Sequence, residues 1–373
     1  MKLLYNIAGT YNSGGMERVL SNKANWLVDN GFDVIIVTTD QKQRVPFFSL
    51  SSKIKQYDLN VNYESNNGRS LLQKIMQYPF KLAKHKRGLK RVIEIEKPDI
   101  TISMFCNDVE FINNINDGSK KVLEVHFCRQ KRIQYARKGI WHIVDIVRSK
   151  RDLCLVKKFN RFVVLTEDDK VLWGKLDNIK VIPNPLSIIP QTTSSLSSKK
   201  VIAVGRFTFQ KGFERLIEAW KIINSAYQDW RLEIIGQGED RLMLQNKIKH
   251  LGLENVVTLH EPIKDIYEIY SDASILAFPS RYEGFGLVII EAFSFGIPVV
   301  AYDCLCGPKD IITDGKDGFL VNEGDVNKMA DRIMYLIKYE DIRKAMGAAA
   351  KETSKKYHEE TIMKRWVKLF EEL

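Results

Sequence analysis

Residues 274–302, SILAFPSRYEGFGLVIIEAFSFGIPVVAY, contain the strongest signal for the fold. The stretch begins and ends with short apolar runs, 274–280 and 297–302, that are typical of buried parallel strands. Between them, a glycine-containing loop leads into a segment that is apolar almost all round, which predicts a buried helix beginning near Phe285. Strands that alternate with helices build doubly wound α/β sheets. The stretch therefore predicts a parallel sheet with helices on its faces.

The same alternation runs through the rest of the chain in two series, separated by the proline- and serine-rich residues 184–199. We predict an α/β protein with two doubly wound Rossmann-like domains, 1–183 and 200–358, joined by a linker at 184–199. A helix expected at 359–373 has one apolar face and must dock on one of the domains, with packing back on the first as one option. The predicted strands are 3–8, 33–39, 99–105, 121–127 and 162–166 in the first series, and 201–205, 232–236, 274–280 and 297–302 in the second.

The composition is that of a globular protein. The 373 residues are 45% hydrophobic and 28% charged, which excludes collagen-like, disordered and small disulfide-scaffold classes. Five cysteines without zinc-ligand spacing fit reduced thiols. The start of the chain lacks the long apolar region of a signal peptide, and no run reaches the roughly 18 apolar residues that span a bilayer. We therefore expect a cytoplasmic protein.

Positive charge is concentrated in the first half. Residues 1–190 carry 32 Lys and Arg against 19 Asp and Glu, a net of +13, whereas residues 191–373 carry 25 against 27. Such an asymmetry favours an anionic partner that only one domain meets. Nucleic acid, anionic lipid headgroups and phosphorylated substrates all satisfy this condition.

Two carboxylates flank the helix start predicted in 274–302. A helix start exposes unpaired N–H groups and favours phosphate oxygens, and Gly284 and Gly286 let a ligand approach that backbone. Glu283 lies just outside the helix, and Glu291 follows eight residues later, about two turns in. One interpretation is structural: Glu291 pairs with a Lys or Arg, and Glu283 is a solvated loop acid. In the other, both carboxylates accept hydrogen bonds from hydroxyl groups of a sugar nucleotide.

A second loop, GRFTFQKG at 205–212, also lies between a predicted strand and a predicted helix. Arg206 and Lys211 flank it, at the end of the strand where ligands gather in doubly wound sheets. Two fixed cations there would neutralise a diphosphate, both when it binds and when it departs. The alternative is an ordinary solvated basic loop.

GRFTFQKG taken together with EGFGLVIIE, residues 283–291, resembles the retaining family 4 glycosyltransferases of the GT-B fold. TYNSGGMER at 10–18 and VIPNPL at 181–186 fit the same family, so the resemblance covers nearly the whole chain. The two glutamates with the upstream Arg and Lys are a specific motif, whereas a glycine loop alone is weak. The resemblance implies two domains facing each other across a cleft, and transfer of a hexosyl group with retention of anomeric configuration.

The resemblance also implies a role for each matching residue. Arg206 and Lys211 hold the donor diphosphate, Glu283 contacts the donor sugar, and Glu291 takes the ribose hydroxyls. From the first domain, His126 faces the sugar; the alternative for this side chain is a satisfied core histidine. The implied catalytic set is Glu283, Arg206, Lys211 and His126, and the implied donor-binding set is Gly14, Gly15, Gly236, Gly238, Ile263, Phe285, Gly286, Leu287 and Glu291.

Two of these assignments rest on loops with weaker signals. Gly236 and Gly238 lie at another predicted strand end and could pass close to the donor, but they are no dinucleotide fingerprint because Arg241 stands where the third glycine belongs. Ile263 falls where the backbone of the family meets the base. Residues 304–308, CLCGP, resemble a loop of members that handle UDP-N-acetylhexosamines; an ordinary connection with inert thiols is the alternative.

We expect no metal ion and no cofactor besides the nucleotide-sugar donor, which the resemblance suggests is UDP-linked. The sequence contains no Asp-x-Asp motif that would bring a divalent cation to the diphosphate. The expected acceptor is a glycan or a polyprenyl-diphosphate-linked glycan.

The basic half contains two segments compatible with an anionic membrane surface at the inner face of the cytoplasmic membrane. In KLAKHKRGLKR, residues 81–91, the cations are interspersed with Leu82, Ala83 and Leu89, and Phe80 precedes them. Solvated helix faces are the alternative. The second segment contains Arg129, Lys131, Arg132, Arg137, Lys138, Arg148, Lys150 and Arg151.

Two rival functions remain at this point. A sugar-nucleotide epimerase or hydrolase would use the same fold without transferring to an acceptor. A basic nucleic-acid-binding protein would also explain the charge, but the chain has no recognisable binding module and its aromatic residues are not clustered with the cations. We therefore expect no nucleic-acid partner.

Overall fold

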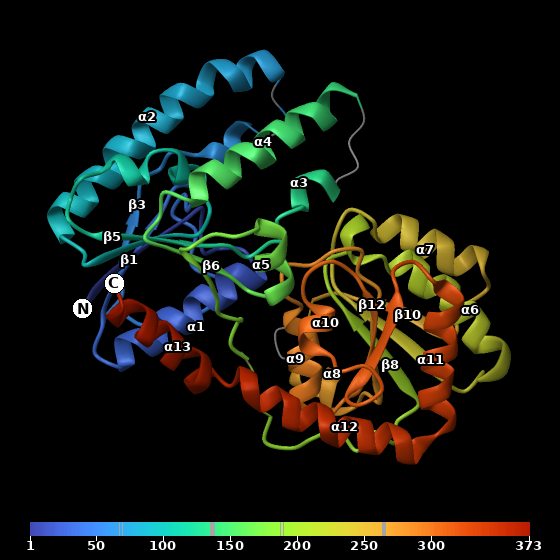
Figure 1. Ribbon diagram of the computed structural model, residues 1–373. Coiled ribbons are helices and arrows are strands. Elements are labelled where there is room, and N and C mark those ends of the chain that lie inside the picture. Colours follow the sequence, from blue (N-terminus) through green and yellow to red (C-terminus); the bar gives the residue numbers. More distant parts are fainter. Residues whose placement is uncertain (67, 69, 135–138, 187, 189, 263–265) are drawn as a thin grey trace. The chain divides into compact units, whose positions relative to one another are not determined.

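The computed structural model describes residues 1–66, 68, 70–134, 139–186, 188, 190–262 and 266–373 (Figure 1). The chain forms two compact units. The first consists of Met1–Leu165, Lys170–Ile182 and Met363–Leu373, and the second of Thr166–Asp169 and Pro183–Ile362. No helix built from the described residues has the length and apolar character needed to cross a lipid bilayer.

The described residues of the first unit contain a seven-stranded parallel sheet in the order β3-β2-β1-β4-β5-β6-β7. The central strands are buried along almost their whole length, as expected when helices cover both faces of a parallel sheet. The strands are β1 (Lys2–Ile7), β2 (Asp33–Thr38), β3 (Lys55–Asp58), β4 (Ile100–Ser103), β5 (Lys120–Glu124), β6 (Arg161–Val164) and β7 (Ile179–Val181). The helices of this part of the chain are α1 (Gly15–Asp29), α2 (Leu71–Glu96), α3 (Lys131–Gln134), α4 (Ile140–Val156) and α5 (Glu167–Trp173), with 3-10 turns η1 (Tyr63–Asn66), η2 (Asn107–Glu110) and η3 (Ile112–Asn114).

The second unit contains a six-stranded parallel sheet, again among the described residues, in the order β10-β9-β8-β11-β12-β13. Its core is formed by apolar side chains of the strands and of the helices that flank them, including Trp220, Ile234 and Val300. The strands are β8 (Lys200–Val204), β9 (Arg231–Ile235), β10 (Val257–His260), β11 (Ile275–Phe278), β12 (Val299–Asp303) and β13 (Gly318–Asn322). The helices are α6 (Phe213–Ala226), α7 (Arg241–His250), α8 (Tyr267–Ser271), α9 (Leu287–Ser294), α10 (Pro308–Ile311), α11 (Val326–Lys338) and α12 (Glu340–Ser354), with 3-10 turns η4 (Phe209–Lys211) and η5 (Lys355–Tyr357).

The predicted fold class is confirmed, because both units are doubly wound parallel α/β structures. In each sheet the strand order reverses at one point, between β1 and β4 in the first unit and between β8 and β11 in the second. Ligands of doubly wound sheets bind beyond the carboxyl ends of the strands at such a switch point. The loops that follow β8 and β11 are therefore the first place to look for a site in the second unit.

Residues 190–199, the second part of the segment predicted as a linker, pack on the second unit. Leu196 is buried, and its carbonyl oxygen accepts hydrogen bonds from Arg343 Nε and Nη2 at 3.1 and 2.9 Å. Ser194 Oγ donates to the carbonyl oxygen of Ala273 at 2.6 Å. This stretch is thus ordered by the second unit rather than extended in solvent.

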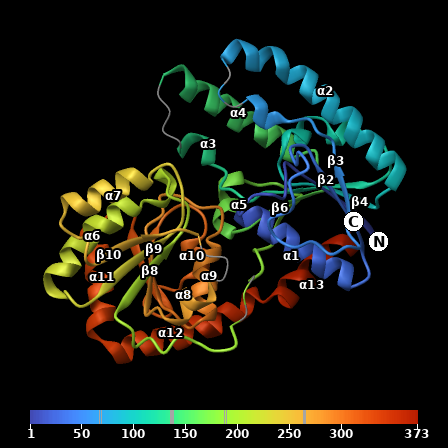
Figure 2. The ribbon, with the colours of Figure 1, turned by 180° about the vertical axis from the view of Figure 1, so that it is seen from behind.

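The last helix, α13 (Glu359–Glu371), returns the chain to the first unit, where it lies beside α1 (Figure 2). Trp366 and Phe370 on its apolar face are almost completely buried, and the Trp366 ring contacts Lys23 of α1. The amphipathic pattern of 359–373 therefore reflects docking on this unit.

Candidate functional site

Two loops meet at the switch point of the second sheet. The loop after β8 contains Arg206 and η4, and the loop after β11 leads through Glu283 to α9. The backbone joins them, because Arg281 N donates to the Gln210 carbonyl oxygen at 2.8 Å and Gln210 Nε2 donates to the Tyr282 carbonyl oxygen at 2.9 Å. The topology and these hydrogen bonds hold the two predicted motifs against each other.

The central contact of the two loops is an ion pair. Lys211 Nζ donates to Glu283 Oε1 at 2.6 Å, and the two side chains are only 15% and 8% exposed. Lys211 Nζ also lies 5.5 Å from the centroid of the Phe278 ring at the end of β11. A cation and a carboxylate thus lie together at the strand ends, shielded from most of the solvent, where their attraction is stronger than at an exposed surface.

The helix that follows Glu283 begins two residues later than predicted. Gly286, with φ of 103° and ψ of 52°, is the N-cap of α9, and Leu287 is the first helical residue. The left-handed conformation of Gly286 explains the difference, since residues with a Cβ rarely adopt it. The predicted burial of the helix is confirmed from Ile289 to Ser294. Glu291 consequently lies about one turn, not two, beyond the first helical residue.

Glu291 is buried and bonded to a tyrosine. Its Oε2 accepts a hydrogen bond from Tyr270 Oη at 3.0 Å, and both side chains are at most 2% exposed. The Tyr270 ring stacks on Phe295 with centroids 5.1 Å apart, which fixes the position of its hydroxyl group. A tyrosine in α8 therefore serves as a partner that the sequence did not reveal for this carboxylate.

The remaining predicted residues of the second unit lie in neighbouring loops. Arg206 is exposed in the loop after β8. Gly236 and Gly238 follow β9, and close packing explains why both positions are glycine. A Cβ on Gly236 would collide with the carbonyl oxygen of Gly205, and a Cβ on Gly238 would collide with that of Phe207. These two glycines let the loops of β8 and β9 approach each other. Ile263 lies outside the described residues.

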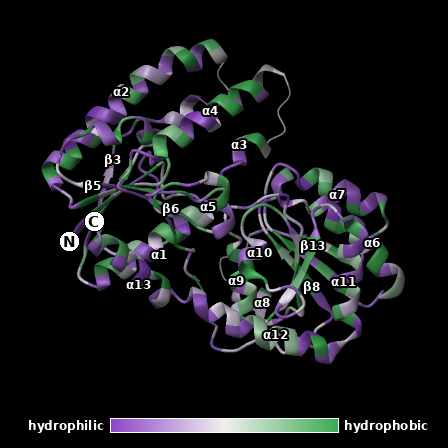
Figure 3. Cartoon of the chain, viewed as in Figure 1, coloured by the Kyte–Doolittle hydropathy of each residue, from purple (hydrophilic) through white to green (hydrophobic). Residues whose placement is uncertain are grey.

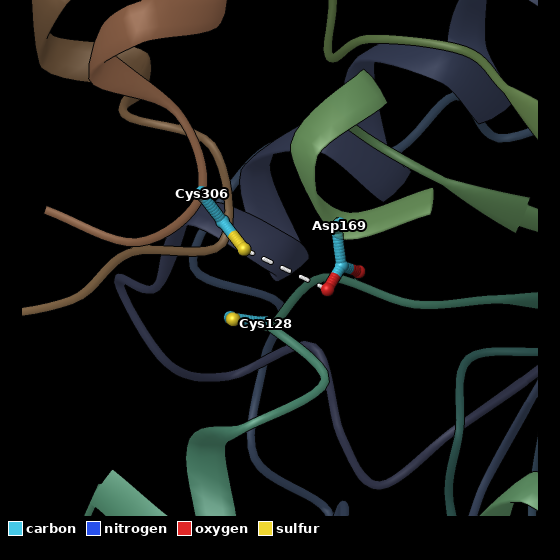
Figure 4. Close-up of side chains that lie close together, drawn as sticks. All are labelled: Cys128, Asp169 and Cys306. Carbon is cyan, nitrogen blue, oxygen red and sulfur yellow. Dashed lines mark hydrogen bonds between the residues drawn. The ribbon is translucent and has the colours of Figure 1, made fainter. Parts of the chain in front are cut away.

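Residues 304–307 form a shelf behind Glu283. Glu283 N donates to the Leu305 carbonyl oxygen at 3.1 Å, and Gly307, with φ of 120°, leaves no space for a Cβ beside the carbonyl oxygen of Phe285. Cys304 and Cys306 are buried, and burial, followed by the nearby Glu283 charge, raises the pKa of the Cys304 thiol well above its usual range. The Cys306 thiol donates to Asp169 Oδ1 at 3.6 Å (Figure 4). Both thiols are therefore packing groups of the loop in its reduced form.

In the first unit, Gly14 and Gly15 lie at the start of α1. Gly14 is the N-cap with an extended backbone, and the Glu17 carboxylate folds back over it so closely that a Cβ on Gly14 would collide with Glu17 Oε2. A carboxylate in the first turn is stabilised by the unpaired N–H groups of a helix start. Glu17 is thus a buried acid at this glycine turn, for which the sequence predicted no role.

His126 follows β5, and its side chain is 6% exposed. Its Nε2 lies 3.0 Å from Glu124 Oε1, and the other carboxylate oxygen, Oε2, accepts from Lys23 Nζ at 2.5 Å. The imidazole ring is thus nearly buried and has a partner, as the structural interpretation requires. The sequence did contain a sign that Lys23 is buried. This residue lies on the apolar face of α1 with Leu20 and Leu27, where a charged side chain requires a partner.

The structure thus gathers Lys211, Glu283 and the start of α9 in the second unit, with Glu291 and the loops of Arg206 and Gly236–Gly238 in the same unit. Gly14, Gly15 and His126 belong to the first unit. A buried ion pair beside a glycine-capped helix start can bind a phosphate-containing ligand and a hydroxyl-rich group side by side.

Comparisons with known proteins place this geometry in a family. Residues 187–353 match the family model described as glycosyl transferases group 1. The amylovoran biosynthesis glycosyltransferase AmsD of Erwinia amylovora is 30% identical over 380 residues, covering 98% of both chains. An α-1,4-N-acetyl-D-galactosaminyltransferase of Campylobacter jejuni, which acts on a diNAcBac-PP-undecaprenol-linked GalNAc disaccharide, is 26% identical, covering 100% of this chain and 99% of its own.

Solved structures show the same fold at low sequence identity. S. aureus TarM, in a crystal structure with fondaparinux, alpha-GlcNAc-glycerol and UDP, superimposes with a TM-score of 0.81 over 99% of both chains at 19% identity. The likeness confirms the GT-B fold that the sequence motifs predicted. The full-length similarity to AmsD and the matching family model lead to one conclusion: the chain is a glycosyltransferase and belongs to the group 1 glycosyl transferases.

Proposed function

We propose that the protein transfers a hexosyl group, including the N-acetylhexosaminyl case, from a UDP-sugar to a hydroxyl group of a glycan or lipid-linked glycan in polysaccharide biosynthesis, with retention of configuration. The observation that carries the proposal is the Lys211–Glu283 ion pair at the start of α9, on the switch point of the second sheet. UDP in the TarM crystal and the undecaprenol-linked acceptor of the C. jejuni relative support the substrate classes.

In this proposal the second unit binds the donor. Lys211 and Arg206 neutralise the diphosphate, and the N–H groups of Phe285, Gly286 and Leu287 add donors at the helix start. Glu283 accepts a hydrogen bond from a hydroxyl group of the donor sugar, and Glu291 accepts from the ribose. The Cys304–Gly307 shelf supports the backbone of Glu283 and Phe285 from behind. His126, Gly14 and Gly15 of the first unit contribute to binding of the sugar and phosphates.

The proposed reaction breaks the bond between the anomeric carbon and the diphosphate oxygen. The acceptor hydroxyl oxygen bonds to that carbon on the face from which UDP departs, and its proton passes to the leaving diphosphate. Negative charge grows on the diphosphate during this step, and fixed cations and helix N–H groups that stabilise growing charge are usually the largest catalytic contribution. Lys211, Arg206 and the start of α9 supply this stabilisation without a metal ion.

A panel of nucleotide sugars tests the proposal. Because a ligand that binds only the native state raises the melting temperature, UDP-sugars should raise it and GDP- and ADP-sugars should raise it less. The stabilising UDP-sugar is then incubated with and without a polyprenyl-diphosphate-linked glycan. Release of UDP that depends on the acceptor supports transfer. Full turnover without an acceptor would instead identify a hydrolase or epimerase.

We further propose that the first unit binds an anionic membrane surface through α2. Leu72, Ile75, Met76 and Phe80 are 59–77% exposed and, by their spacing, lie on one face of this helix, next to exposed cations such as Lys74. Hydrophobic and hydrophilic residues alternate along the α2 ribbon (Figure 3). This exposed apolar surface, residues 72–80, lies one to two helical turns before the predicted segment, residues 81–91. Leu89 is buried and Leu82 packs against the core, so only Phe80 and Ala83 of the expected apolar residues are exposed.

The second basic segment is partly used within the first unit. Arg129 lies 4.6 Å from the centroid of the Trp173 ring, and Arg151 pairs with Glu110 at 3.0 Å. Arg148 and Lys150 are exposed, whereas Arg137 and Lys138 lie outside the described residues. The apolar face of α2 is therefore the better target for an experiment than the cations of α4.

Sedimentation with lipid vesicles tests this surface. The protein should sediment with phosphatidylglycerol vesicles but not with phosphatidylcholine vesicles, and high salt should weaken the binding. Replacing Met76 and Phe80 by Ser should reduce it, whereas Leu242→Ser, at a 67% exposed position on α7 of the second unit, should not. Equal binding by both variants would contradict the assignment to α2.

A further inference from the structure

A buried lysine and a buried glutamate lie behind His126 in the first unit. Lys23 of α1 is completely buried and Glu124 at the end of β5 is 1% exposed. The Glu124 carboxylate joins two partners, since Oε2 accepts from Lys23 Nζ at 2.5 Å and Oε1 lies 3.0 Å from His126 Nε2. The three side chains form one continuous row from the helix to the imidazole ring.

Burial lowers the pKa of Lys23, and the neighbouring Glu124 carboxylate opposes this effect. Lys23 Nζ lies 3.9 Å from the centroid of the Trp366 ring on α13 and 5.1 Å from that of Tyr5 on β1. Aromatic faces attract a desolvated ammonium group, and Glu124 completes its environment. Burying a cation and a carboxylate together is weakly stabilising at best, because both lose their hydration. Such a pair is therefore a candidate for a role other than stability.

The carboxylate can only accept hydrogen bonds. Burial alone would raise the pKa of Glu124, but the Lys23 ammonium group and the His126 ring outweigh it and lower the pKa to about 2. An ionised carboxylate has no hydrogen to donate, so His126 Nε2 must donate the hydrogen of this contact. The neutral ring then carries its lone pair on Nδ1.

We propose that Glu124 is a positioning residue that holds His126 in the Nε2–H tautomer, so that Nδ1 accepts a hydrogen bond from a hydroxyl group of the sugar substrate, and that Lys23 orients the Glu124 carboxylate. The inference rests on the proposed function, because that function supplies the hydroxyl group. Only this tautomer offers an acceptor at Nδ1, and a sugar hydroxyl brings the hydrogen that an acceptor needs. Lys23 acts by occupying one carboxylate oxygen and leaving the other for the ring.

Glu124→Gln tests the tautomer directly. The Lys23 ammonium group only donates, so it will take the amide oxygen of the glutamine and turn the NH2 group toward His126. The ring must then accept at Nε2 and move its hydrogen to Nδ1. We expect nitrogen-15 spectra of the imidazole at about pH 8.5, where a histidine ring is ordinarily neutral, to show the Nε2–H form in the wild type and the Nδ1–H form in E124Q.

Two further variants separate positioning from packing. In Lys23→Met the carboxylate still accepts from the ring, so the Nε2–H tautomer should remain. In the double variant K23M/E124Q the amide is free to turn its oxygen to the ring, and the tautomer should return toward Nε2–H. A merely structural pair would not be rescued in this way. Asp117→Asn, which alters the Lys121–Asp117 pair next to the other end of β5, is the matched control and should leave the His126 spectrum unchanged.

Activity is the second readout. E124Q should lower kcat/KM about tenfold, the effect of one lost hydrogen bond, and the double variant should recover part of the loss. The spectra need no substrate, so the two ideas fail separately: an inactive wild type with the expected tautomers would refute the proposed function and leave the positioning role standing. A wild-type ring in the Nδ1–H form would overturn the positioning role, and this measurement needs no variant to fold. An unchanged His126 spectrum in folded E124Q would overturn it as well.

Discussion

Lys211 Nζ and Glu283 Oε1 lie 2.6 Å apart, although 72 residues separate them in the chain. The contact joins the loop after β8 to the loop after β11, which are neighbouring strands of the second sheet. Each residue therefore neutralises the other before any ligand arrives. A donor that binds here must bring phosphate oxygens for the lysine and hydroxyl hydrogens for the carboxylate, and a sugar nucleotide has both.

We predict that Lys211→Met lowers transfer at least about a hundredfold, since removal of one group that stabilises growing charge typically costs that much. Glu283→Gln should lower transfer about ten- to a hundredfold, because it weakens a charge-assisted hydrogen bond to the donor sugar. K211M should also weaken UDP binding in calorimetry, because its phosphate contact is lost. Circular dichroism should show a folded protein in both cases.

Lys200→Met is the matched control for K211M. Lys200 is 22% exposed and pairs with Asp272 and Glu233 at 2.8 and 3.0 Å, but it lies at the amino end of β8, away from the proposed site. Its variant should keep UDP affinity and transfer close to those of the wild type. If K211M and K200M behaved alike, the assignment of Lys211 to the diphosphate would be wrong.

Gly307→Ala should damage the site through its backbone. The added Cβ would push against the carbonyl oxygen of Phe285 and displace the start of α9. Gly315→Ala is the comparison, because Gly315 also has a positive φ, 74°, but no atom within 4 Å of the added Cβ. We expect G315A to cost about 1–2 kcal/mol of stability from its backbone alone, and G307A to cost more and to lower transfer. Denaturant unfolding and activity of the two variants decide the question.

Asp108→Asn should stabilise the protein at neutral and alkaline pH. Asp108 is completely buried and accepts from Ser103 Oγ at 2.9 Å, and burial raises its pKa to about 7. Because the folded protein holds this proton more tightly than the unfolded chain, stability falls as pH rises from about 4 to 7, by up to about 4 kcal/mol. The amide cannot ionise, so D108N avoids this loss. Its advantage in melting temperature should be absent at pH 4 and largest near pH 8; a constant difference would contradict the assignment.

Trp366→Ala should destabilise the first unit by about 3–5 kcal/mol, the usual cost of removing a buried aromatic side chain. The loss should exceed that of Trp366→Phe, which keeps a ring face over Lys23. Lys368→Ala, at an exposed position of the same helix, should change stability by less than about 0.5 kcal/mol. Hydrogen exchange of α1 and β1 would show that the effect falls on this unit.

The strands that sequence reasoning found and missed follow a physical rule. All nine predicted strands correspond to interior strands of the two sheets. Among the described residues, the four strands that were not predicted, β3, β7, β10 and β13, are the edges of those sheets. An interior parallel strand is covered on both faces and is therefore rich in apolar residues, which the sequence shows. An edge strand such as β3, KQYD, is mostly exposed and has no such pattern. Its position depends on pairing with β2, which is a property of the whole fold.

For the candidate site, the sequence likewise predicted which loops lie together but not which side chains touch. Lys211 and Glu283 could be assigned to one crevice because both follow strands that the topology makes neighbours. Their direct contact, and the hydrogen bond from Tyr270 to Glu291, depend on side-chain directions that no spacing in the sequence contains. The same holds for Lys23 and Glu124. The sequence shows that Lys23 lies on a buried helix face, but it does not show that Glu124 is its partner.

The return of residues 363–373 to the first unit has a consequence for biosynthesis. A ribosome makes the chain from the amino end, and domains ordinarily fold as they emerge. Here Lys23 is made early, yet the Trp366 indole that covers it is made only after residues 183–362 of the second unit. The nascent first unit therefore lacks this cover throughout synthesis of the second unit, and a chain cut between residues 362 and 363 would leave the amino-terminal unit, rather than the second one, incompletely covered.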